Sequence, residues 1–354
     1  NSMTINRFIL NLKPYIPIPH KIWELNNQNK FLKLDWNEST ISPSPKVIKA
    51  LQDFLQYGNL NWYPNTHNNV LYRELSKYCN LNSNNIEIFA GSDSLHEYIL
   101  SVFLNTGDKV CIVSPTYDNF RSRAQGIGIK TLFFNVDCEF NLDFQEFYKY
   151  LKINVPQMVY ICNPNNPTGK AYNKKKIKEL MRDFCDILFI IDEAYFEFYG
   201  ESFSDCINEF ENLIITRTFS KAFALASCRI GYCLSQSQNI NLLNKLRNSK
   251  SISSLAQIAA IYALKDKQYI ENYVRKIIQS KLFFTNALRE MGLKVYDSDA
   301  NFVLLKCEKN LFNILKCKGI FIRDYSHIIP MHYRITIGTM SQMKRVVKVL
   351  HKEL

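Results

Sequence analysis

The sequence predicts an α/β protein in which a mostly parallel sheet is followed by a smaller α+β domain. Short runs that are apolar at every position alternate with amphipathic stretches through the middle of the 354-residue chain. This pattern is typical of strands buried on both faces, because helices cover both faces of a parallel sheet. After about Ser235 the pattern changes to long helical stretches followed by short strands. The change indicates a second unit with a core of its own.

Five buried strands are expected in the first unit. They cover residues 110–113, 158–162, 187–191, 213–216 and 231–234. A helix is expected over residues 174–184, where charged side chains lie on one face and apolar side chains on the other. The alternation of strands and helices implies parallel strands joined by covering helices. Ligands of such sheets bind at the carboxyl ends of the strands, so the residues that follow each strand are the candidates for a functional site.

The second unit is expected to start with helices and to finish with short strands. Helical patterns cover residues 240–250 and 257–292, strand patterns cover residues 294–296, 302–306, 320–323 and 333–337, and a last helix starts at Ser341. We therefore divide the chain into an N-terminal arm that joins the small domain (residues 1–40), a large domain (residues 41–240) and a small C-terminal α+β domain (residues 241–354).

The composition is that of an ordinary globular protein. Hydrophobic residues make up 47% of the chain and charged residues 21%, which argues against disorder. No stretch of about 18 apolar residues predicts a membrane span, and no signal peptide is visible. The net charge of +12 comes from lysines scattered along an asparagine-rich chain, which favours a coding bias over a nucleic-acid surface. The ten cysteines form no C-x-x-C pair or zinc-type cluster, so we expect reduced, buried thiols and a cytoplasmic protein.

Polar side chains follow three consecutive strands of the predicted sheet. The turn at residues 163–169 contains two prolines and a glycine, and its rigid backbone holds the amide of Asn166 in place. Asp192 and Tyr195 follow the next strand, and Lys221 follows the third. A carboxylate at the end of an apolar strand is costly to bury and needs a cation or strong donors as partners. The crossovers therefore bring an amide, a carboxylate, a phenol and an ammonium to one edge of the sheet.

A phosphate site and an aromatic ring are expected at the same edge. Ser92 and Asp93 precede the helical stretch at residues 95–104, and free backbone N–H groups at a helix start bind phosphate. Tyr117 follows the strand at residues 110–113 and places its ring at this edge. The edge thus combines an anion site and a stacking ring with the other four groups.

Lys221 has the surroundings of a reactive amine. Its small and apolar neighbours would desolvate it, and the cationic Arg229 lies close by in the sequence. Both effects lower the pKa of a lysine and free its amine to form a Schiff base. An aldehyde on a phosphorylated pyridine ring needs such a lysine, a carboxylate for its ring nitrogen and a phosphate site. The predicted edge therefore suits pyridoxal phosphate.

Nine ordered segments of the chain carry a family resemblance. They read LDWNES, YPN, GSDS, PTYDNF, NPNNPTG, DEAY, SKAFALASCRIGY, ANFVLLK and YRITIGT. Over residues 14–339 the chain resembles class II aminotransferases of fold type I, and within these the histidinol-phosphate aminotransferases. The resemblance implies a fold type I transferase with a mostly parallel seven-stranded sheet in its large domain, pyridoxal 5'-phosphate as cofactor and a homodimer as the active unit.

Carried over by position, the resemblance implies a role for each cofactor residue. Lys221 would bind the aldehyde and move the proton of the substrate, and Asp192 would keep the pyridine nitrogen protonated. Asn166 and Tyr195 would bind the phenolate oxygen, and Tyr117 would stack on the ring. The phosphate would be held by Ser92, Asp93, Thr218, Ser220 and Arg229. No metal ion is implied.

The resemblance also implies the residues that face the substrate. Tyr15 and Asn37 would line the site with Arg323 and Arg334, and Tyr63 would reach it from the neighbouring subunit. In relatives that act on phosphorylated amino alcohols the arginine pair grips the phosphate, and in other members an arginine grips a carboxylate. Guanidinium groups bind both anions through paired hydrogen bonds.

These residues predict an aminotransferase that moves an amino group between glutamate and a small, phosphorylated keto or aldehyde compound. Histidinol phosphate, another amino-alcohol phosphate and an amino-sugar precursor stay open as substrates. A phosphoamino-acid decarboxylase similar to threonine-phosphate decarboxylase is the alternative with the same cofactor, since the grip on the substrate decides which bond breaks. A catalytically silent binding protein or a nucleic-acid binder on the same scaffold is a third interpretation.

Signals of other sites are absent from the sequence. The segment Gly126-Ile127-Gly128 is followed by Thr131 where a dinucleotide fingerprint needs glycine. No nucleophile elbow is present. The histidines share no helical face or metal-ligand spacing and are expected to have ordinary roles: His20, His67, His96, His327, His332 and His351.

Overall fold

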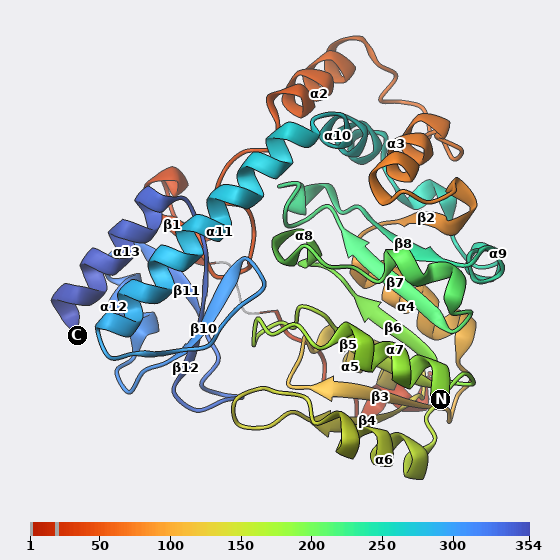
Figure 1. Ribbon diagram of the computed structural model, residues 1–354. Helices are drawn as coiled ribbons and strands as arrows, with labels where there is room; N and C mark the ends of the chain where they lie inside the picture. Colours follow the sequence, from red (N-terminus) through yellow and green to blue (C-terminus); the bar gives the residue numbers. More distant parts are fainter. Residues whose placement is uncertain (1–2, 18–20) are drawn as a thin grey trace.

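The computed structural model describes residues 3–17 and 21–354 of the chain (Figure 1). Residues 1–2 and 18–20, which belong to the predicted N-terminal arm, lie outside the described residues. The described part forms two sheets, of seven and five strands. Its α-helices are α1 (Arg7–Leu10), α2 (Pro45–Tyr57), α3 (Asn69–Cys79), α4 (Ser92–Phe103), α5 (Asn119–Gly126), α6 (Phe144–Asn154), α7 (Lys174–Asp183), α8 (Phe196–Tyr199), α9 (Ser237–Asn244), α10 (Ser254–Lys265), α11 (Lys267–Glu290), α12 (Leu311–Lys316) and α13 (Met340–Glu353).

The larger sheet has the strand order β2-β8-β7-β6-β5-β3-β4. Its strands are β2 (Ile86–Phe89), β3 (Lys109–Ser114), β4 (Lys130–Asn135), β5 (Met158–Cys162), β6 (Leu188–Asp192), β7 (Leu213–Thr218) and β8 (Gly231–Ser235). The run from β7 to β4 is parallel throughout, whereas β8 is antiparallel to both of its neighbours. The predicted α/β fold with a mostly parallel seven-stranded sheet is therefore confirmed.

Helices cover both faces of this sheet (Figure 1). The buried side chains of β6 alternate between the two core clusters on these faces. Ile190 belongs to the same core cluster as Leu95 of α4. Phe189 and Ile191 belong to the cluster on the other face, together with Ile177 of α7. Every residue of β5, β7 and β8 is buried. Burial on both faces explains why these strands are continuous apolar runs in the sequence.

The smaller sheet has the strand order β1-β11-β12-β10-β9. Its strands are β1 (Leu32–Leu34), β9 (Lys294–Val295), β10 (Phe302–Lys306), β11 (Ile320–Asp324) and β12 (His332–Thr336). The pair of β1 and β11 is parallel, and the other pairs are antiparallel. Helices α11, α12 and α13 pack together beside this sheet (Figure 1). The four strands expected in the second unit all form, and no end differs from its expected place by more than one residue.

Two helices of the second unit differ from the expected patterns. The pattern over residues 257–292 is divided into α10 and α11 at Asp266, whose backbone leaves the helical region with ψ 56°. The Asp266 carboxylate accepts a hydrogen bond from Ser44 and lies 3.6 Å from Lys46 Nζ, so a contact with the start of α2 fixes this break. The helix expected over residues 240–250 ends at Asn244.

The N-terminal segment contacts several parts of the fold in turn. Helix α1 lies against α5, where Asn6 Nδ2 donates to the carbonyl oxygen of Gly126 at 3.3 Å. Strand β1 then joins the small sheet, and α2 and α3 pack on α10 (Figure 1). The division of the chain at residues 40 and 240 stays a prediction, and the contacts of α10 cross its second boundary.

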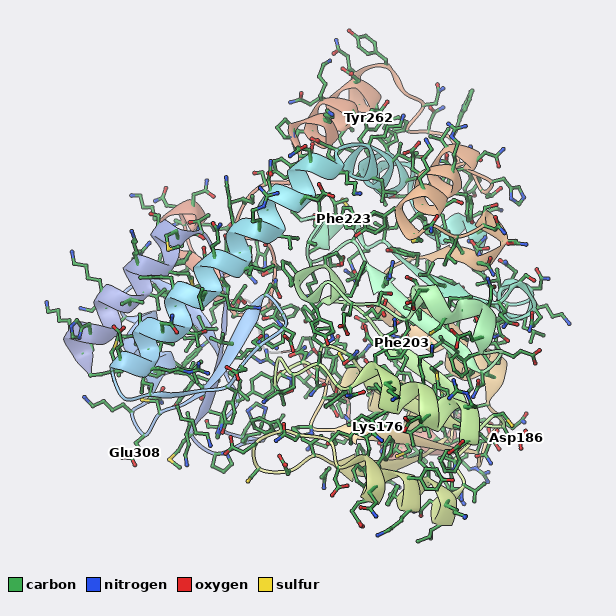
Figure 2. The ribbon with its side chains drawn as sticks, in the orientation of Figure 1. Lys176, Asp186, Phe203, Phe223, Tyr262 and Glu308 are labelled. Carbon is green, nitrogen blue, oxygen red and sulfur yellow. The ribbon has the colours of Figure 1, made fainter. Side chains whose placement is uncertain are left out.

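Side chains divide between core and surface in the usual way. Figure 2 shows Phe203 and Phe223 inside the fold, where both are buried, and Lys176, Asp186 and Glu308 at its surface. Over residues 3–17 and 21–354, no helix combines the length and the apolar content that a membrane span requires.

All ten cysteines are free thiols. Cys138, Cys185 and Cys317 are exposed, so the expectation of buried thiols is wrong at these positions. Each of the three lies in a turn rather than in a covered strand. Cys228 is half-buried, and the remaining cysteines are buried.

Candidate active site

The carboxyl ends of β5, β6 and β7 meet at one edge of the large sheet. Cys162 at the end of β5 pairs with Asp192 at the end of β6, and Asp192 pairs with Thr216 of β7. Asn166 and Lys221 lie in the segments that follow β5 and β7. Because of this register, the segments that carry the predicted site residues all begin at the same edge of the sheet.

The amine of Lys221 lies inside this edge. Its Nζ donates to the carbonyl oxygen of Trp36 at 3.1 Å and lies 5.6 Å from the centre of the Tyr195 ring. Desolvation lowers the pKa of Lys221 from 10.5 to about 8, and the charges of Arg334 and Arg229 act in the same direction. A larger fraction of this amine is therefore neutral at pH 7 than of a lysine in water.

The carboxylate of Asp192 is buried among hydrogen-bond donors. The Tyr160 hydroxyl donates to Oδ2 at 2.6 Å, and the Ala194 N–H donates to Oδ1 at 3.1 Å. His96 Nε2 lies 3.8 Å from the same Oδ2 and 2.9 Å from Thr216 Oγ1. Asp192 is only 4% exposed, so these groups replace water as its partners.

Asn166 and Tyr195 are tied to residues of the small sheet and its neighbouring segment. Arg334 on β12 donates from Nη1 to Asn166 Oδ1 at 2.6 Å. Asn37 donates from Nδ2 to the Tyr195 hydroxyl at 3.1 Å, and its own N–H donates to Thr336 Oγ1 at 3.0 Å. Burial raises the pKa of Tyr195, so its phenol is protonated at neutral pH. The structure thus brings Asn37 and Arg334 to the amide and the phenol.

Helix α4 begins at the same edge beside an arginine. Gly91 precedes the helix with φ +86°, and a Cβ atom there would lie 2.6 Å from Arg229 Nη2. Ser92 is the first residue of α4, and the N–H groups of a first helical turn have no partners within the helix. Unpaired N–H groups next to a guanidinium form a site that suits phosphate.

Arg229 is held by the segment that follows β7. Its Nη1 donates to Ser220 Oγ at 3.3 Å and to the Ala226 carbonyl oxygen at 3.1 Å. Its Nη2 lies 4.0 Å from Asp93 Oδ2. The Ser220 N–H donates to Thr218 Oγ1 at 3.0 Å. The residues predicted to hold a phosphate therefore form one connected group.

Two tyrosines stand next to this group. The rings of Tyr15 and Tyr117 meet edge to face with centroids 5.5 Å apart and planes at 75°. The Tyr117 hydroxyl donates to Asp93 Oδ2 at 3.3 Å, and the Tyr15 N–H donates to Ser122 Oγ at 3.3 Å. The predicted substrate residue Tyr15 thus contacts the predicted stacking ring.

Arg323 lies beside Arg334 but differs from it in its contacts. The two residues are direct partners in the pairing of β11 and β12. Within the described part of the chain, no group forms a hydrogen bond or an ion pair with the Arg323 guanidinium, and its Nε is buried and unpaired. Desolvation lowers the pKa of Arg323. Of the two guanidinium groups, that of Arg334 forms hydrogen bonds within the described chain and that of Arg323 forms none.

Tyr63 is not brought to this edge by its own chain. Its side chain is 82% exposed, and Lys250 Nζ lies 4.9 Å from the centre of its ring. Leu60 and Trp62 in the same loop are also exposed.

The arrangement of these residues agrees with the proteins to which the chain is similar. The family model described as aminotransferase class I and II matches residues 29–350. The chain belongs to this family. The aminotransferase is 51% identical to the dihydroxyacetone phosphate transaminase of Campylobacter jejuni, over 99% of this chain and 97% of that protein. It is 34% identical to the histidinol-phosphate aminotransferase of Ruminiclostridium cellulolyticum, over 94% of this chain and 93% of that protein.

Solved structures agree with the fold of the aminotransferase. The histidinol-phosphate aminotransferase of Sinorhizobium meliloti in complex with pyridoxal-5'-phosphate superposes with a TM-score of 0.88 at 24% identity, over 100% of this chain and 99% of that chain. The enzyme from Clostridium acetobutylicum gives a TM-score of 0.83 at 26% identity, over 91% of this chain and 100% of that chain. The predicted fold type I architecture is confirmed, and the cofactor is pyridoxal phosphate, as in class I and II aminotransferases.

The residues of the aminotransferase fit this cofactor. The start of α4 with Arg229 suits the phosphate, because a side chain at Gly91 would fill the place. The buried carboxylate of Asp192 suits the ring nitrogen, and the depressed pKa of Lys221 suits an amine that must bind an aldehyde. Among the residues described, no group of three or more His, Cys, Asp and Glu side chains could hold a metal ion.

Sequence reasoning missed the two side chains that contact the Asp192 carboxylate. The ordinary role expected for His96 stays a prediction, although its Nε2 lies 3.8 Å from Asp192 Oδ2 and its ring packs edge to face on the Tyr160 ring at 5.5 Å. His96 lies one helical turn after Ser92 on α4, and this spacing could have indicated that His96 lies on the same helix face as the predicted phosphate residue. His20 lies outside the described residues.

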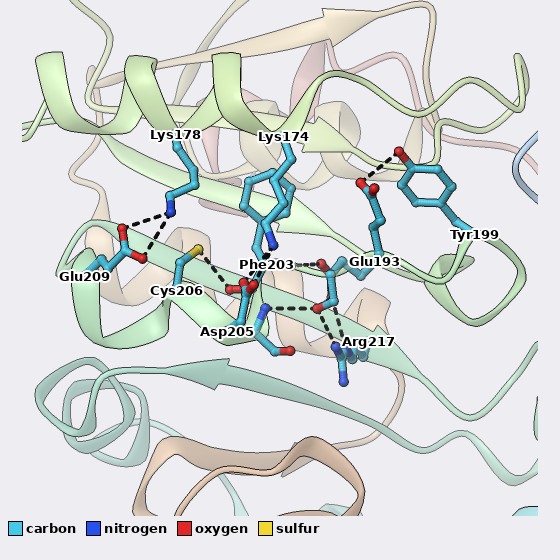
Figure 3. A network of polar contacts seen from close by, with 12 residues as sticks. Lys174, Lys178, Glu193, Tyr199, Phe203, Asp205, Cys206, Glu209 and Arg217 are labelled. Atoms are coloured by element: carbon cyan, nitrogen blue, oxygen red, sulfur yellow. Dashed lines mark hydrogen bonds and ion pairs between the residues drawn. The ribbon is translucent and has the colours of Figure 1, made fainter.

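A buried ion pair supports the ends of β6 and β7 in the aminotransferase (Figure 3). Arg217 Nε lies 3.0 Å from Glu193 Oε1, and neither side chain is more than 3% exposed. The Phe203 N–H donates to Glu193 Oε2 at 2.8 Å. Glu193 directly follows Asp192 and Arg217 directly precedes Thr218, so the pair fixes the backbone beside two predicted cofactor residues. Nothing in the sequence pairs these two side chains.

Proposed function

We propose that this enzyme transfers an amino group between glutamate and a small phosphorylated carbonyl compound. The observation that supports the substrate class is the pair Arg323 and Arg334 at directly paired positions of β11 and β12. Arg334 is engaged by groups of the chain, whereas the Arg323 guanidinium has no partner in the described residues. A desolvated cation without a partner favours a ligand that brings a charge of its own.

Each cofactor residue has a proposed task that follows from its contacts. Bound pyridoxal phosphate supplies an aldehyde that takes up the amino group and a ring that withdraws electrons from the substrate Cα. Lys221 holds that aldehyde and carries the proton of the substrate Cα. Asp192 would hold a proton on the ring nitrogen of the bound cofactor, with its carboxylate held in place by the Tyr160 hydroxyl. Asn166 and Tyr195 donate to the phenolate oxygen.

The remaining predicted residues bind and orient. Ser92, Asp93, Thr218, Ser220 and Arg229 hold the phosphate of the cofactor. Tyr117 would stack on the ring of the cofactor, and Tyr15 and Asn37 would line the space for the substrate.

Dihydroxyacetone phosphate is the acceptor that we propose first. A relative that is 51% identical over 99% of this chain is a dihydroxyacetone phosphate transaminase, whereas the histidinol-phosphate aminotransferase of Ruminiclostridium cellulolyticum is 34% identical over 94% of this chain. Exchange of the ketone oxygen of this compound for an amino group gives an amino-alcohol phosphate. That product belongs to the substrate class that the arginine pair suits.

The test uses the two halves of the reaction with the purified, cofactor-loaded enzyme. Glutamate alone should convert the bound coenzyme to its amine form, seen by absorbance, with release of 2-oxoglutarate. Dihydroxyacetone phosphate should then restore the aldehyde form and yield the amino-alcohol phosphate, identified by mass spectrometry. No conversion by glutamate would count against the amino donor, and carbon dioxide release from a phosphoamino acid would favour the decarboxylase instead.

We further propose that the active unit is a cytoplasmic homodimer in which Tyr63 reaches the site of the partner. The exposed loop that carries Leu60, Trp62 and Tyr63 supports this arrangement, because apolar side chains at 64%, 68% and 82% exposure gain from being covered. Symmetric homodimers exchange equal contributions across such a surface.

A further inference from the structure

Tyr325 lies between the two arginines of the substrate site. It comes two residues after Arg323, directly beyond the end of β11 at Asp324. The guanidinium carbon of Arg323 is 5.7 Å from the centre of the Tyr325 ring, and that of Arg334 is 5.3 Å from it. Two like charges at paired strand positions repel each other, and one phenol ring faces both of them.

Arg334 is held in place by three acceptors. Its Nη1 donates to Asn166 Oδ1 at 2.6 Å and to the Tyr325 hydroxyl oxygen at 3.2 Å. Its Nη2 donates to the Asp35 carbonyl oxygen at 2.6 Å. The direction of this guanidinium is therefore set by the chain before any ligand binds.

Arg323 is in the opposite state. It has five N–H donors, and none of them has a hydrogen-bond acceptor among residues 3–17 and 21–354. Of the two arginines, Arg323 is thus the one whose fork is free for an anion of the substrate.

The Tyr325 hydroxyl has a donor to spare at the same place. Its oxygen accepts a hydrogen bond from Arg334, and within the described chain its own proton meets no acceptor. The residue is 8% exposed, and its N–H donates to the His332 carbonyl oxygen at 3.0 Å, so both ring and backbone are fixed. A hydroxyl accepts and donates at once, so its bond to Arg334 leaves the proton available.

We propose that Tyr325 contacts the substrate and selects phosphate over carboxylate at the Arg323 site. The Arg323 fork satisfies two oxygens of an anion, which is all that a carboxylate has. A phosphate group has a third terminal oxygen, and the Tyr325 hydroxyl donates to that oxygen. This role rests on the proposed function, in which Arg323 binds the phosphate of the substrate.

The test compares two anions as competitive inhibitors of the cofactor-loaded enzyme. The conversion of the coenzyme by glutamate is followed by absorbance in the presence of inorganic phosphate or of succinate. In Tyr325→Phe the inhibition constant for phosphate should rise about tenfold, because a hydrogen bond to a charged group is lost. The constant for succinate should stay within about twofold, since the fork still serves both carboxylate oxygens.

Tyr333→Phe is the matched control. Tyr333 adjoins Arg334 on β12, is also buried, and leaves the strand on the opposite side. Its loss of a hydroxyl should change neither inhibition constant. Coenzyme absorbance and the unfolding midpoint of each variant check that the site is intact, and Tyr325→Phe keeps the ring that both guanidiniums face.

The role of Tyr325 is overturned if Tyr325→Phe leaves phosphate inhibition unchanged, or if both anions weaken equally, which would indicate that the phenol only positions Arg334. Arg323→Gln separates this outcome from a failure of the proposed function. Unchanged phosphate inhibition in Arg323→Gln would remove the phosphate grip itself. A loss in Arg323→Gln without a loss in Tyr325→Phe would remove only the selectivity assigned to Tyr325.

Discussion

The Lys221 amine shows how a single side chain is prepared by its surroundings. Burial lowers its pKa from 10.5 to about 8, and the neutral form is the one that attacks an aldehyde. At pH 7 about a tenth of such amines are neutral, against fewer than about one in a thousand for a free lysine. The rate at which the cofactor-free protein takes up pyridoxal phosphate should rise with pH, bend near pH 8 and level off above it.

Absorbance after rapid mixing at a series of pH values measures this bend. Lys281 offers a control, because burial also lowers its pKa to about 8 while its amine donates to the Ala300 carbonyl oxygen at 2.7 Å. Lys281→Met should leave the bend in place. A rate that keeps rising to pH 10 would show that the Lys221 ammonium is not desolvated.

The hydrogen bonds to the buried Asp192 carboxylate should contribute to the stability of the fold. Tyr160→Phe removes the hydroxyl that donates to Oδ2 at 2.6 Å, and a lost hydrogen bond to a buried charge costs about 1.5–3 kcal/mol. Burial raises the pKa of Tyr160, so the phenol remains a donor across the neutral range. The free energy of unfolding in urea, measured without cofactor, should fall by about that amount.

Tyr172→Phe is the comparison for this experiment. The Tyr172 hydroxyl is buried without a hydrogen-bond partner among the described residues, so its removal should change the free energy of unfolding by less than about 0.5 kcal/mol. Equal losses in the two variants would mean that the Asp192 contact adds nothing.

The sequence predicted those site residues whose chemistry is visible at a strand end. Lys221, Asp192 and Asn166 follow apolar strands, and a polar group in that place requires an explanation. His96 and Tyr160 could not be predicted in the same way. Tyr160 lies within an apolar run and His96 within a helix, and their relation to Asp192 exists only because α4 packs against the strands.

At the level of elements, the start of α4 has a backbone conformation that suits a phosphate ligand, with glycine at the position next to Arg229. Gly91→Ala should place a Cβ atom 2.6 Å from Arg229 Nη2 and displace the guanidinium. The affinity for pyridoxal phosphate should then fall by about tenfold or more, because a charged hydrogen-bond donor to phosphate is lost. Equilibrium dialysis with pyridoxal phosphate measures this affinity.

Gly200→Ala separates the effect on the ligand from the effect on the backbone. Gly200 has φ +90°, close to the +86° of Gly91, but a Cβ atom there would have nothing within 4 Å. Both variants should lose about 1 kcal/mol of stability from the left-handed backbone, and only Gly91→Ala should lose the cofactor. Equal affinities would show that Arg229 does not take part in binding.

Strands that form continuous apolar runs were predicted well, as was the amphipathic helix α7, whereas strands β1 and β2 were not expected from their patterns. Strands β5 and β10 have the expected bounds, because every residue of β5 and most of β10 are buried. Strand β4 was not foreseen, since it is half exposed at the edge of the sheet and begins with Lys130. The break between α10 and α11 depends on the contact of Asp266 with Ser44, 222 residues away, which no local pattern contains.

At the level of the whole molecule, the homodimer can be tested by mixing two inactive variants. Lys221→Ala lacks the amine, and Tyr63→Ala lacks the ring that is proposed to cross to the partner. A mixed dimer contains one complete site, because the intact Lys221 then meets the Tyr63 of the other subunit. Random mixing should restore about a quarter of the wild-type activity.

The dimer assay has two informative failures. No recovery after mixing would place Tyr63 in the site of its own chain or in no site at all. Full activity of Tyr63→Ala by itself would show that the ring is dispensable. The mass of the loaded enzyme in solution, compared with 41.4 kDa for one chain, gives the independent check.

The bonds that fasten the two sheets to each other have a mechanical consequence. Asn37, whose N–H is bound to Thr336 of β12, donates to the Tyr195 hydroxyl, and Arg334 of β12 donates to Asn166. Both bonds therefore connect the small sheet to segments that follow strands of the large sheet. Each bond ends on a side chain, Asn166 or Tyr195, that is proposed to bind the cofactor. A ligand that binds these groups would break both hydrogen bonds, so the contacts between the two parts of the chain would then depend on whether the site is occupied.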